Sequence, residues 1–233
     1  AASVFYYIFT VQVGASPAEI FLASGFMTIG VTAYVLWLLP DSLIRMILWI
    51  LTHSLYRLNV VGRDHIPDRG GALFVANHFS FVDSLFVIAS TDRWVRFLMH
   101  REYYEQPLIY PLAKIMGVIP IAGNDGPRAL LQSLREAANS IQNGDIVCIF
   151  AEGEMTRTGM MLPFRRGFER IMKGLTQPII PIHLDRVWGS IFSFEKGRFF
   201  WKWPHHYPQA ITITYGKPLP ANTPAASLRA AVQ

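Results

Sequence analysis

Short apolar runs alternate with longer segments of mixed apolar and polar residues over most of the chain. From residue 59 onward, the apolar runs predict strands at 60–61, 73–76, 95–99, 118–121, 146–150, 179–182 and 211–215. Between these runs, helices are expected over 82–89, 107–116, 127–142 and 164–173. This alternation is typical of an α/β domain with a mostly parallel sheet flanked by helices.

The first 58 residues follow a different pattern. Residues 20–39 carry no charge, and about 20 apolar residues suffice for a helix to cross the hydrocarbon core of a bilayer. We therefore expect transmembrane helical segments within residues 1–40, with the buried core helix of a soluble protein as the alternative. Residues 41–58 repeat aliphatic and aromatic residues at helical spacing, which predicts an amphipathic helix at the membrane interface with Trp49 and Tyr56 at headgroup depth. Packing of this helix on the α/β domain, assigned to residues 59–233, is the alternative, and the two arrangements are compatible.

The composition also points to a membrane. Charged residues make up only 16% of the chain and its net charge is +5, while the mean hydropathy is +0.28. A basic protein suits either nucleic acid or an anionic membrane surface, but the sequence contains no RNA-binding signature and no Lys/Arg-rich run, so no nucleic-acid partner is expected. Arg45, Arg57 and Arg63 follow the apolar segment, and the positive-inside rule therefore places the α/β domain on the cytoplasmic face.

Candidate catalytic residues follow the apolar run Leu73–Ala76. His78 lies in the expected turn after this strand, Ser80 is the expected N-cap of the next helix, and Asp83 comes three residues later. A spacing of five places His78 and Asp83 about 140° apart on a regular helix, so they meet only if His78 lies outside the helix and folds back over its first turn. Asp83 would then accept the Nδ1 proton and leave Nε2 as a base. A capping box with a loop histidine is the alternative.

The remaining reactive residue types give no further site. The single cysteine, Cys148, falls inside the apolar run Ile146–Phe150 and is expected to be buried. No disulfide can form within the chain, and no Cys/His group has the spacing of a zinc site. We therefore expect no metal and no organic cofactor.

The motif Asn77-His78-x-x-x-x-Asp83 resembles the first motif of the glycerolipid (lysophospholipid) acyltransferase family. The resemblance continues in the family's order at Gly117–Ile121, Phe150–Gly153 and Ile180–Ile182, over roughly residues 58–220. It implies that His78 is the general base acting on an acceptor hydroxyl, with Asp83 orienting it. It also implies a substrate site that includes Asn77 and Ser80.

The third motif of the resemblance departs from the family pattern. Glu152 either binds a substrate hydroxyl or holds the turn, and Gly153 allows close backbone approach to the substrate. The motif's arginine is displaced to Arg157, which we expect to bind the acceptor phosphate, although a solvated loop arginine is the alternative. Arg165 and Arg166, in the family's Phe-Lys/Arg-x-Gly segment, are candidates to meet lipid phosphates or those of an acyl carrier.

The resemblance implies transfer of an acyl group from acyl-CoA or acyl carrier protein to the hydroxyl of a lysophospholipid. Backbone N–H groups near the helix start at Asp83, or at the Gly153 turn, are expected to stabilise the oxyanion. Gly123 occupies the place of the usual arginine of the second motif, and its loss favours an acceptor that carries a head group, such as lysophosphatidylethanolamine, for phospholipid remodelling. A lysophosphatidate (1-acylglycerol-3-phosphate) acyltransferase and a non-catalytic lipid- or carrier-binding membrane module are the alternatives.

Some members of the family that this chain resembles are fused between a lipid-flipping transporter and a fatty-acyl-activating domain, in the bacterial inner (cytoplasmic) membrane. The resemblance to these proteins predicts that residues 4–39 are the last helices of a transporter domain. A stand-alone enzyme with its own membrane hairpin is the alternative.

Overall fold

The computed structural model describes residues 14, 16–38, 40–121, 126–197 and 207–233. Contacts within the chain divide it into two compact units, Ala1–Ile44 and Arg45–Gln233, which are described separately. The predicted apolar stretch at residues 4–13 and the motif position Gly123 lie outside the described residues.

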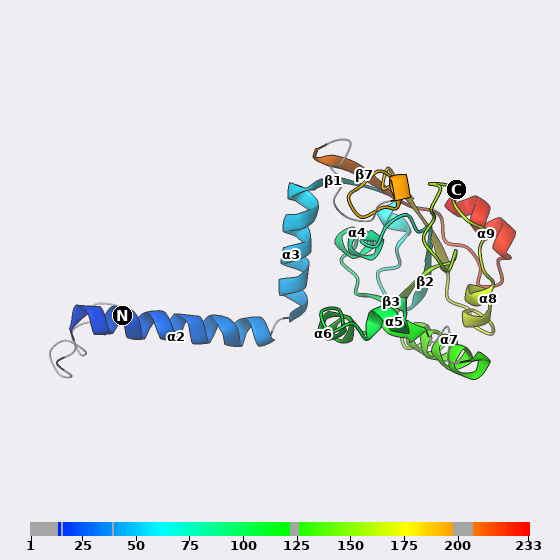
Figure 1. The fold of residues 1–233 in the computed structure, drawn as a ribbon. Helices are drawn as coiled ribbons and strands as arrows, with labels where there is room; N and C mark the ends of the chain where they lie inside the picture. The colour runs from blue at the N-terminus through cyan, green and yellow to red at the C-terminus, as the bar shows by residue number, and fades with distance from the viewer. Residues whose placement is uncertain (1–13, 15, 39, 122–125, 198–206) are drawn as a thin grey trace. The chain divides into compact units, whose positions relative to one another are not determined.

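A seven-stranded sheet with the order β1-β7-β6-β2-β5-β3-β4 forms the centre of the second unit (Figure 1). Neighbouring strands run parallel except β6 and β7, which are antiparallel. The prediction of a mostly parallel sheet in an α/β domain is therefore confirmed. Its strands are β1 (Tyr56–Val61), β2 (Ala72–Ala76), β3 (Val95–His100), β4 (Ile119–Ile121), β5 (Ile146–Phe150), β6 (Ile179–Asp185) and β7 (Gln209–Tyr215).

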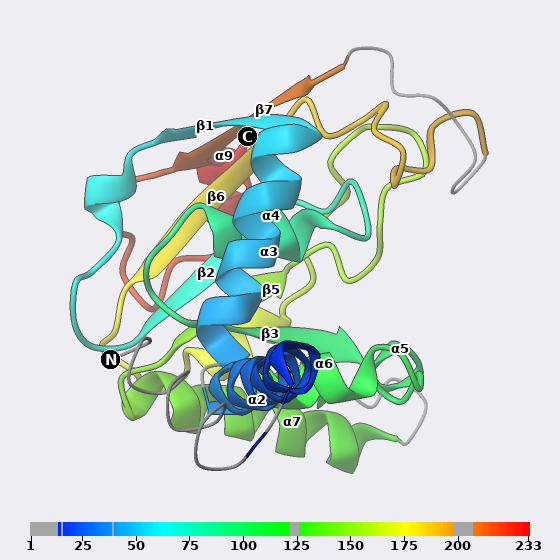
Figure 2. The same cartoon turned by 90° about the vertical axis from the view of Figure 1, so that its left-hand side faces the viewer.

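Helices cover both faces of this sheet. In Figure 2, α4 lies in front of the sheet and α9 behind it. One core combines α7, α8 and α9 with alternate residues of β2 and β5, such as Leu73, Val75 and Val147. On the opposite face Phe74 contacts the ring of Tyr215, since successive strand residues point to opposite sides. The helices of this unit after β1 are α4 (Asp83–Ala89), α5 (Arg101–Tyr104), α6 (Tyr110–Ile115), α7 (Pro127–Gln142), α8 (Gly167–Ile171) and α9 (Ala225–Val232), with 3-10 turns η2 (Arg63–His65) and η3 (Glu195–Gly197).

The expected interfacial helix is shorter than the sequence pattern suggests. The helix α3 spans Pro40–Ser54, and β1 already begins at Tyr56, so the sheet starts three residues before the predicted boundary at residue 59. The placement of Tyr56 at headgroup depth is wrong: its side chain is only 6% exposed and its ring packs edge-on against Phe86 at 4.9 Å. Parallel pairing of Tyr56 with Gln209 on β7 overrides the helical pattern here.

The α3 residues that belong to the second unit show an amphipathic pattern. Leu48 and Thr52 are buried, whereas Met46, Trp49 and Ile50 are at least half exposed. For Leu48 and Thr52 the structure therefore shows packing on the α/β domain, the alternative that the sequence pattern left open.

The first unit contains α2 (Pro17–Leu38), a helix of 22 residues with Glu19 in its first turn. Its segment Pro17–Val35 is the one helix in the described part of the chain that is long and apolar enough to cross a membrane. By length and composition alone, this helix agrees with the predicted membrane segment.

Candidate active site

The candidate catalytic residues lie where the parallel strands β2 and β5 end at the same edge of the sheet. β2 ends at Ala76, and the buried side chain of Asn77 fixes the turn that follows. The Asn77 amide donates to the Leu184 carbonyl at 3.0 Å and accepts the Leu184 N–H at 2.7 Å. Because these bonds tie the turn to β6 and Asn77 is fully buried, the structure gives this residue a structural role and does not support the predicted substrate contact.

His78 and Asp83 meet as predicted. The imidazole Nδ1 lies 2.9 Å from Asp83 Oδ2, and His78 lies outside α4, which begins at Asp83. A carboxylate only accepts, so the neutral imidazole carries its proton on Nδ1 and leaves the Nε2 lone pair available as a base. The side chain of His78 is 21% exposed and that of Asp83 is fully buried. This difference suits their roles, because a base must reach the substrate, whereas the residue that orients it need not.

The Asp83 carboxylate also organises the turn around the histidine. Its Oδ2 accepts the N–H groups of Phe79 at 2.6 Å and Ser80 at 2.8 Å, and its Oδ1 accepts the Ser80 hydroxyl at 2.5 Å. The residue before α4 is Val82, and no side chain caps the helix there, so the expected N-cap role of Ser80 is wrong. Ser80 is fully buried and bonded to Asp83, which does not support its predicted contact with substrate.

Phe150 is a neighbour of His78 that the sequence analysis did not single out. Its ring stacks on the imidazole with centroids 4.1 Å apart and planes inclined by 14°. Phe97 on β3 stacks behind Phe150 at 6.2 Å. These rings restrict rotation of the imidazole on one side. The sequence pattern could have pointed to Phe150, because it is the last residue of the second buried strand that ends at this edge.

Glu152 connects the catalytic turn to the loop after β5. It is 1% exposed, and its two oxygens accept the N–H of His78 at 2.7 Å and the N–H of Leu162 at 2.6 Å. Burial raises the pKa of Glu152, and the two N–H donors act in the opposite direction. The structure therefore shows that Glu152 holds the turn, which is one of the two roles that the sequence left open. Contact of Glu152 with a substrate hydroxyl stays a prediction.

Gly153 forms a turn that no other residue would fit without strain. Its φ is +75°, and an added Cβ would lie 2.7 Å from Arg165 Cδ. The Arg165 guanidinium lies across this glycine and pairs with Glu154 at 3.3 Å, with both side chains about two thirds exposed. The positive φ explains the glycine, because the exposed Arg165 side chain could move aside for a Cβ; close approach of substrate to Gly153 stays a prediction.

The three predicted phosphate-binding arginines are not equivalent. Arg157 is exposed, its guanidinium lies 5.2 Å from the ring centroid of Phe194, and the preceding residue Thr156 donates its N–H to the His78 carbonyl at 3.1 Å. Within the described residues, no ion pair to Arg157 is formed. By contrast, Arg165 pairs with Glu154, and Arg166 pairs with Glu169 at 2.6 Å. Arg157 therefore combines an unpaired guanidinium with a backbone next to the base.

Four of the backbone N–H groups near the two turns expected to stabilise an oxyanion already donate hydrogen bonds within the protein. Those of Phe79 and Ser80 donate to Asp83, that of Phe81 donates to the Phe192 carbonyl, and that of Gly153 donates to the Phe150 carbonyl. These four donors are therefore not available in this arrangement, and an oxyanion site formed by the remaining N–H groups of the two turns stays a prediction.

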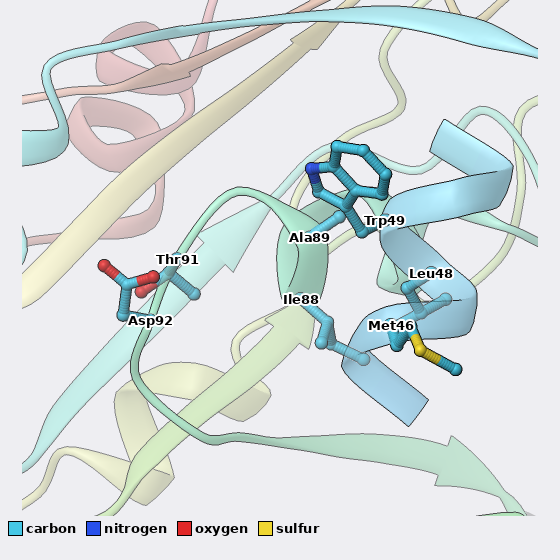
Figure 3. Close-up of a pocket in the computed structure, with 7 residues that line it drawn as sticks. All are labelled: Met46, Leu48, Trp49, Ile88, Ala89, Thr91 and Asp92. Carbon is cyan, nitrogen blue, oxygen red and sulfur yellow. The ribbon is translucent and has the colours of Figure 1, made fainter. Parts of the chain in front are cut away.

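Two hollows in the described surface lie away from the dyad. One, of about 400 Å³, lies between α3 and α4 and is lined by Met46, Leu48, Trp49, Ile88, Ala89, Thr91 and Asp92 (Figure 3). The other, of about 680 Å³, lies beside α8 and the loop before α9, and Arg166 and Lys173 are among its lining residues. Neither is lined by His78 or Asp83, so the candidate site is defined by the position of the dyad at the strand ends and not by either of these two hollows.

The described residues contain no group of three or more His, Cys, Asp or Glu side chains that could hold a metal ion. Cys148 is fully buried in β5, as predicted. Burial raises the pKa of its thiol, which disfavours a nucleophilic thiolate at this position.

Known proteins resemble this chain in both sequence and fold. The family model described as Acyltransferase matches residues 57–185, more than half of the chain. A 1-acyl-sn-glycerol-3-phosphate acyltransferase of Limnanthes douglasii is 29% identical over 70% of this chain and 54% of its own length. One from Cocos nucifera is 26% identical over 75% of this chain and 53% of its own length. The chain therefore spans about half the length of these curated relatives.

A solved structure shares the fold. The crystal structure of the 1-acyl-sn-glycerophosphate (LPA) acyltransferase PlsC from Thermotoga maritima superposes with a TM-score of 0.65, covers 99% of this chain and 88% of the other, and is 19% identical in sequence. The family match extends from β1 to the end of β6 and includes both the His78–Asp83 pair and the Glu152 turn. The chain belongs to the glycerolipid acyltransferase family.

Proposed function

We propose that the chain transfers a fatty acyl group from an acyl thioester to the free hydroxyl of 1-acyl-sn-glycerol-3-phosphate. The observation that carries this proposal is the 2.9 Å contact between His78 Nδ1 and the buried Asp83 carboxylate. The relatives from Limnanthes douglasii and Cocos nucifera are named for this acceptor. They favour it over a lysophospholipid with a head group.

In the proposed reaction, His78 Nε2 removes the proton of the acceptor hydroxyl as its oxygen attacks the thioester carbonyl. Asp83 stabilises the imidazolium that forms, because its carboxylate already accepts a hydrogen bond from Nδ1–H. The tetrahedral intermediate collapses, the C–S bond breaks, and the leaving thiolate takes the proton that His78 holds. An acyl-enzyme is unnecessary, since the acceptor hydroxyl is itself the nucleophile.

Arg157 is the proposed partner of the acceptor phosphate. Its neighbour Thr156 is bonded to the His78 backbone, so a phosphate held by Arg157 would keep the glycerol near the base. Arg165 and Arg166 would first have to leave Glu154 and Glu169, which makes them weaker candidates.

An Arg157→Ala variant should raise the KM for the acceptor more than it lowers kcat, as expected for a loss of uniform binding. An effect confined to donor saturation would assign Arg157 to the acyl carrier instead.

Lysophosphatidylethanolamine is the competing acceptor, favoured by the sequence because Gly123 replaces an arginine of the family motif. A phosphomonoester carries more charge than a phosphodiester and gains more from cationic donors. The two acceptors are therefore compared in one mixture with one fixed donor, first acyl-CoA and then acyl carrier protein. Mass spectrometry should find phosphatidate as the main product. Diacyl phosphatidylethanolamine as the main product would overturn the proposed acceptor, and bound lipid without product would identify a non-catalytic module.

A membrane location is part of this proposal, with the domain of residues 59–233, extended to Tyr56, on the cytoplasmic face. The length and composition of α2 support membrane association, and the basic residues after it support the orientation. The bacterial inner membrane and a fusion to transporter and acyl-activating domains stay predictions of the sequence resemblance.

A further inference from the structure

Exposed apolar side chains concentrate in one segment of the α/β domain. Between residues 101 and 115, which include α5 and α6, five large apolar side chains are 40–94% exposed, and Leu108 is the most exposed at 94%. These five residues are Tyr103, Leu108, Tyr110, Leu112 and Ile115. In the rest of the described chain after Ser54, exposed large apolar residues are isolated in the sequence: Val61, Leu131, Met160 and Tyr207. We call residues 101–115 the α5–α6 surface.

The local structure holds this surface in place rather than leaving it as loose chain. Ala113 on α6 and Met116 after it are buried, so they attach the segment to the domain while the residues around them face outward. The rings of Tyr104 and Tyr110 pack edge-to-face at 5.6 Å, and Lys114 Nζ lies 6.0 Å from the centroid of the Tyr110 ring. An ordered group of exposed apolar residues of this kind marks an interaction site.

The α5–α6 surface is continuous with the catalytic turn. Its segment follows β3, which pairs with β5 in the sheet, and α5 begins directly after β3 (Figure 1). The ring of Tyr103 packs against that of Phe81 with centroids 5.8 Å apart, and Phe81 lies three residues after His78. Whatever covers the α5–α6 surface therefore lies beside the turn that carries the proposed base.

We propose that the α5–α6 surface rests on the phospholipid bilayer and brings the catalytic turn to the lipid acceptor. This inference rests on the proposed function, because that function requires a lipid to leave a bilayer at His78. Tyrosines with exposed leucine and isoleucine side chains are typical of segments at headgroup depth. Arg101 and Lys114 are balanced by Glu102 and Glu105, so apolar contact rather than net charge drives this binding, and added salt should weaken it little.

A fluorescent probe at residue 108 tests this surface in the full chain. Cys148 is fully buried, so a nitrobenzoxadiazole label attaches selectively to a Leu108→Cys variant. The matched control is Asp68→Cys, an exposed position before β2 at the opposite edge of the sheet. Vesicles of mixed phosphatidylcholine and phosphatidylglycerol should shift the emission of the label at 108 to the blue and allow quenching by spin-labelled phospholipid, with no such change at 68.

Two results of this measurement would overturn the proposal. One is a label at 108 that stays in water while the protein sediments with vesicles. The other is a shift at 108 that depends on protein concentration and occurs without vesicles, because it would assign the surface to a second copy of the chain.

Activity separates this inference from the proposed function. Leu108→Glu should raise the apparent KM for vesicle-borne lysophosphatidate by about tenfold, since a leucine loses its apolar contact. It should leave a short-chain, water-soluble lysophosphatidate unaffected. Equal losses with both acceptors would contradict a membrane role. His78→Ala should lose turnover but keep the fluorescence shift at 108, so an inactive wild-type chain that still shows this shift would refute the proposed function alone.

Discussion

Replacing Asp83 by asparagine tests whether the buried carboxylate acts on chemistry as well as on the turn. Asparagine has nearly the same shape, and its amide oxygen can take the place of Oδ2, which accepts from His78, Phe79 and Ser80. The Ser80 hydroxyl can rotate to accept from the new amide N–H instead of donating to Oδ1. The substitution therefore preserves the Nδ1–H tautomer of His78 and removes the negative charge.

The size of the effect follows from the geometry of the pair. Two unit charges about 4 Å apart interact by about 4 kcal/mol at an effective dielectric constant of about 20. The full burial of Asp83 favours a value of this order, and the 21% exposure of His78 reduces it. Because about 1.4 kcal/mol corresponds to a tenfold change in rate, Asp83→Asn should lower kcat by about 10²- to 10³-fold. Weaker bonds to the turn should also lower the free energy of unfolding by about 1–3 kcal/mol.

The assay measures kcat at saturating acceptor and donor, together with unfolding in urea. Ser80→Ala is the matched control, because it removes one hydrogen bond to the same carboxylate and keeps its charge. This control should lose about 1 kcal/mol of stability and retain kcat within a few fold. If Asp83→Asn also retained kcat within a few fold while losing stability, Asp83 would serve only the turn and the proposed mechanism would be refuted.

Three further predictions concern the stability of the fold, two of them at the turn beside the dyad and one at the opposite ends of the strands. Glu152→Gln places an amide N–H₂ against the N–H of His78 or Leu162, so the free energy of unfolding in urea should fall by about 1–3 kcal/mol; an unchanged value would show that Glu152 does not hold the turn. Gly153→Ala should lower the free energy of unfolding by about 1–2 kcal/mol, because residue 153 has a positive φ that strains an alanine. Stability equal to wild type would show that the backbone at residue 153 imposes no such strain. Arg93→Ala leaves the carbonyls of residues 67, 70 and 144 without their guanidinium donor, which should lower the melting temperature more than Arg93→Lys does; equal effects would refute this.

The sequence by itself determined the regular elements wherever local signals are strong. The bounds of β5 and α7 match the expected ranges, because β5 is an unbroken apolar run and α7 lies between Pro127 and the Asn143-Gly144 turn. The spacing of His78 and Asp83 showed that they can meet only if the histidine lies outside the helix, and it left a capping box with a loop histidine as the alternative. The bounds of β5 and α7 depend on residues close together in the chain, so the sequence contains them directly.

Only the tertiary structure decided what surrounds the pair. Asn77 is held by Leu184, 107 residues later in the chain, and Glu152 reaches the His78 backbone across 74 residues. Tyr56 follows a helical pattern locally but pairs with β7, and Phe150 meets His78 because β2 and β5 are neighbours in the sheet. The sequence contains these side chains, but their roles depend on which strands become neighbours, and pairing between distant strands is a property of the whole fold rather than of any local pattern.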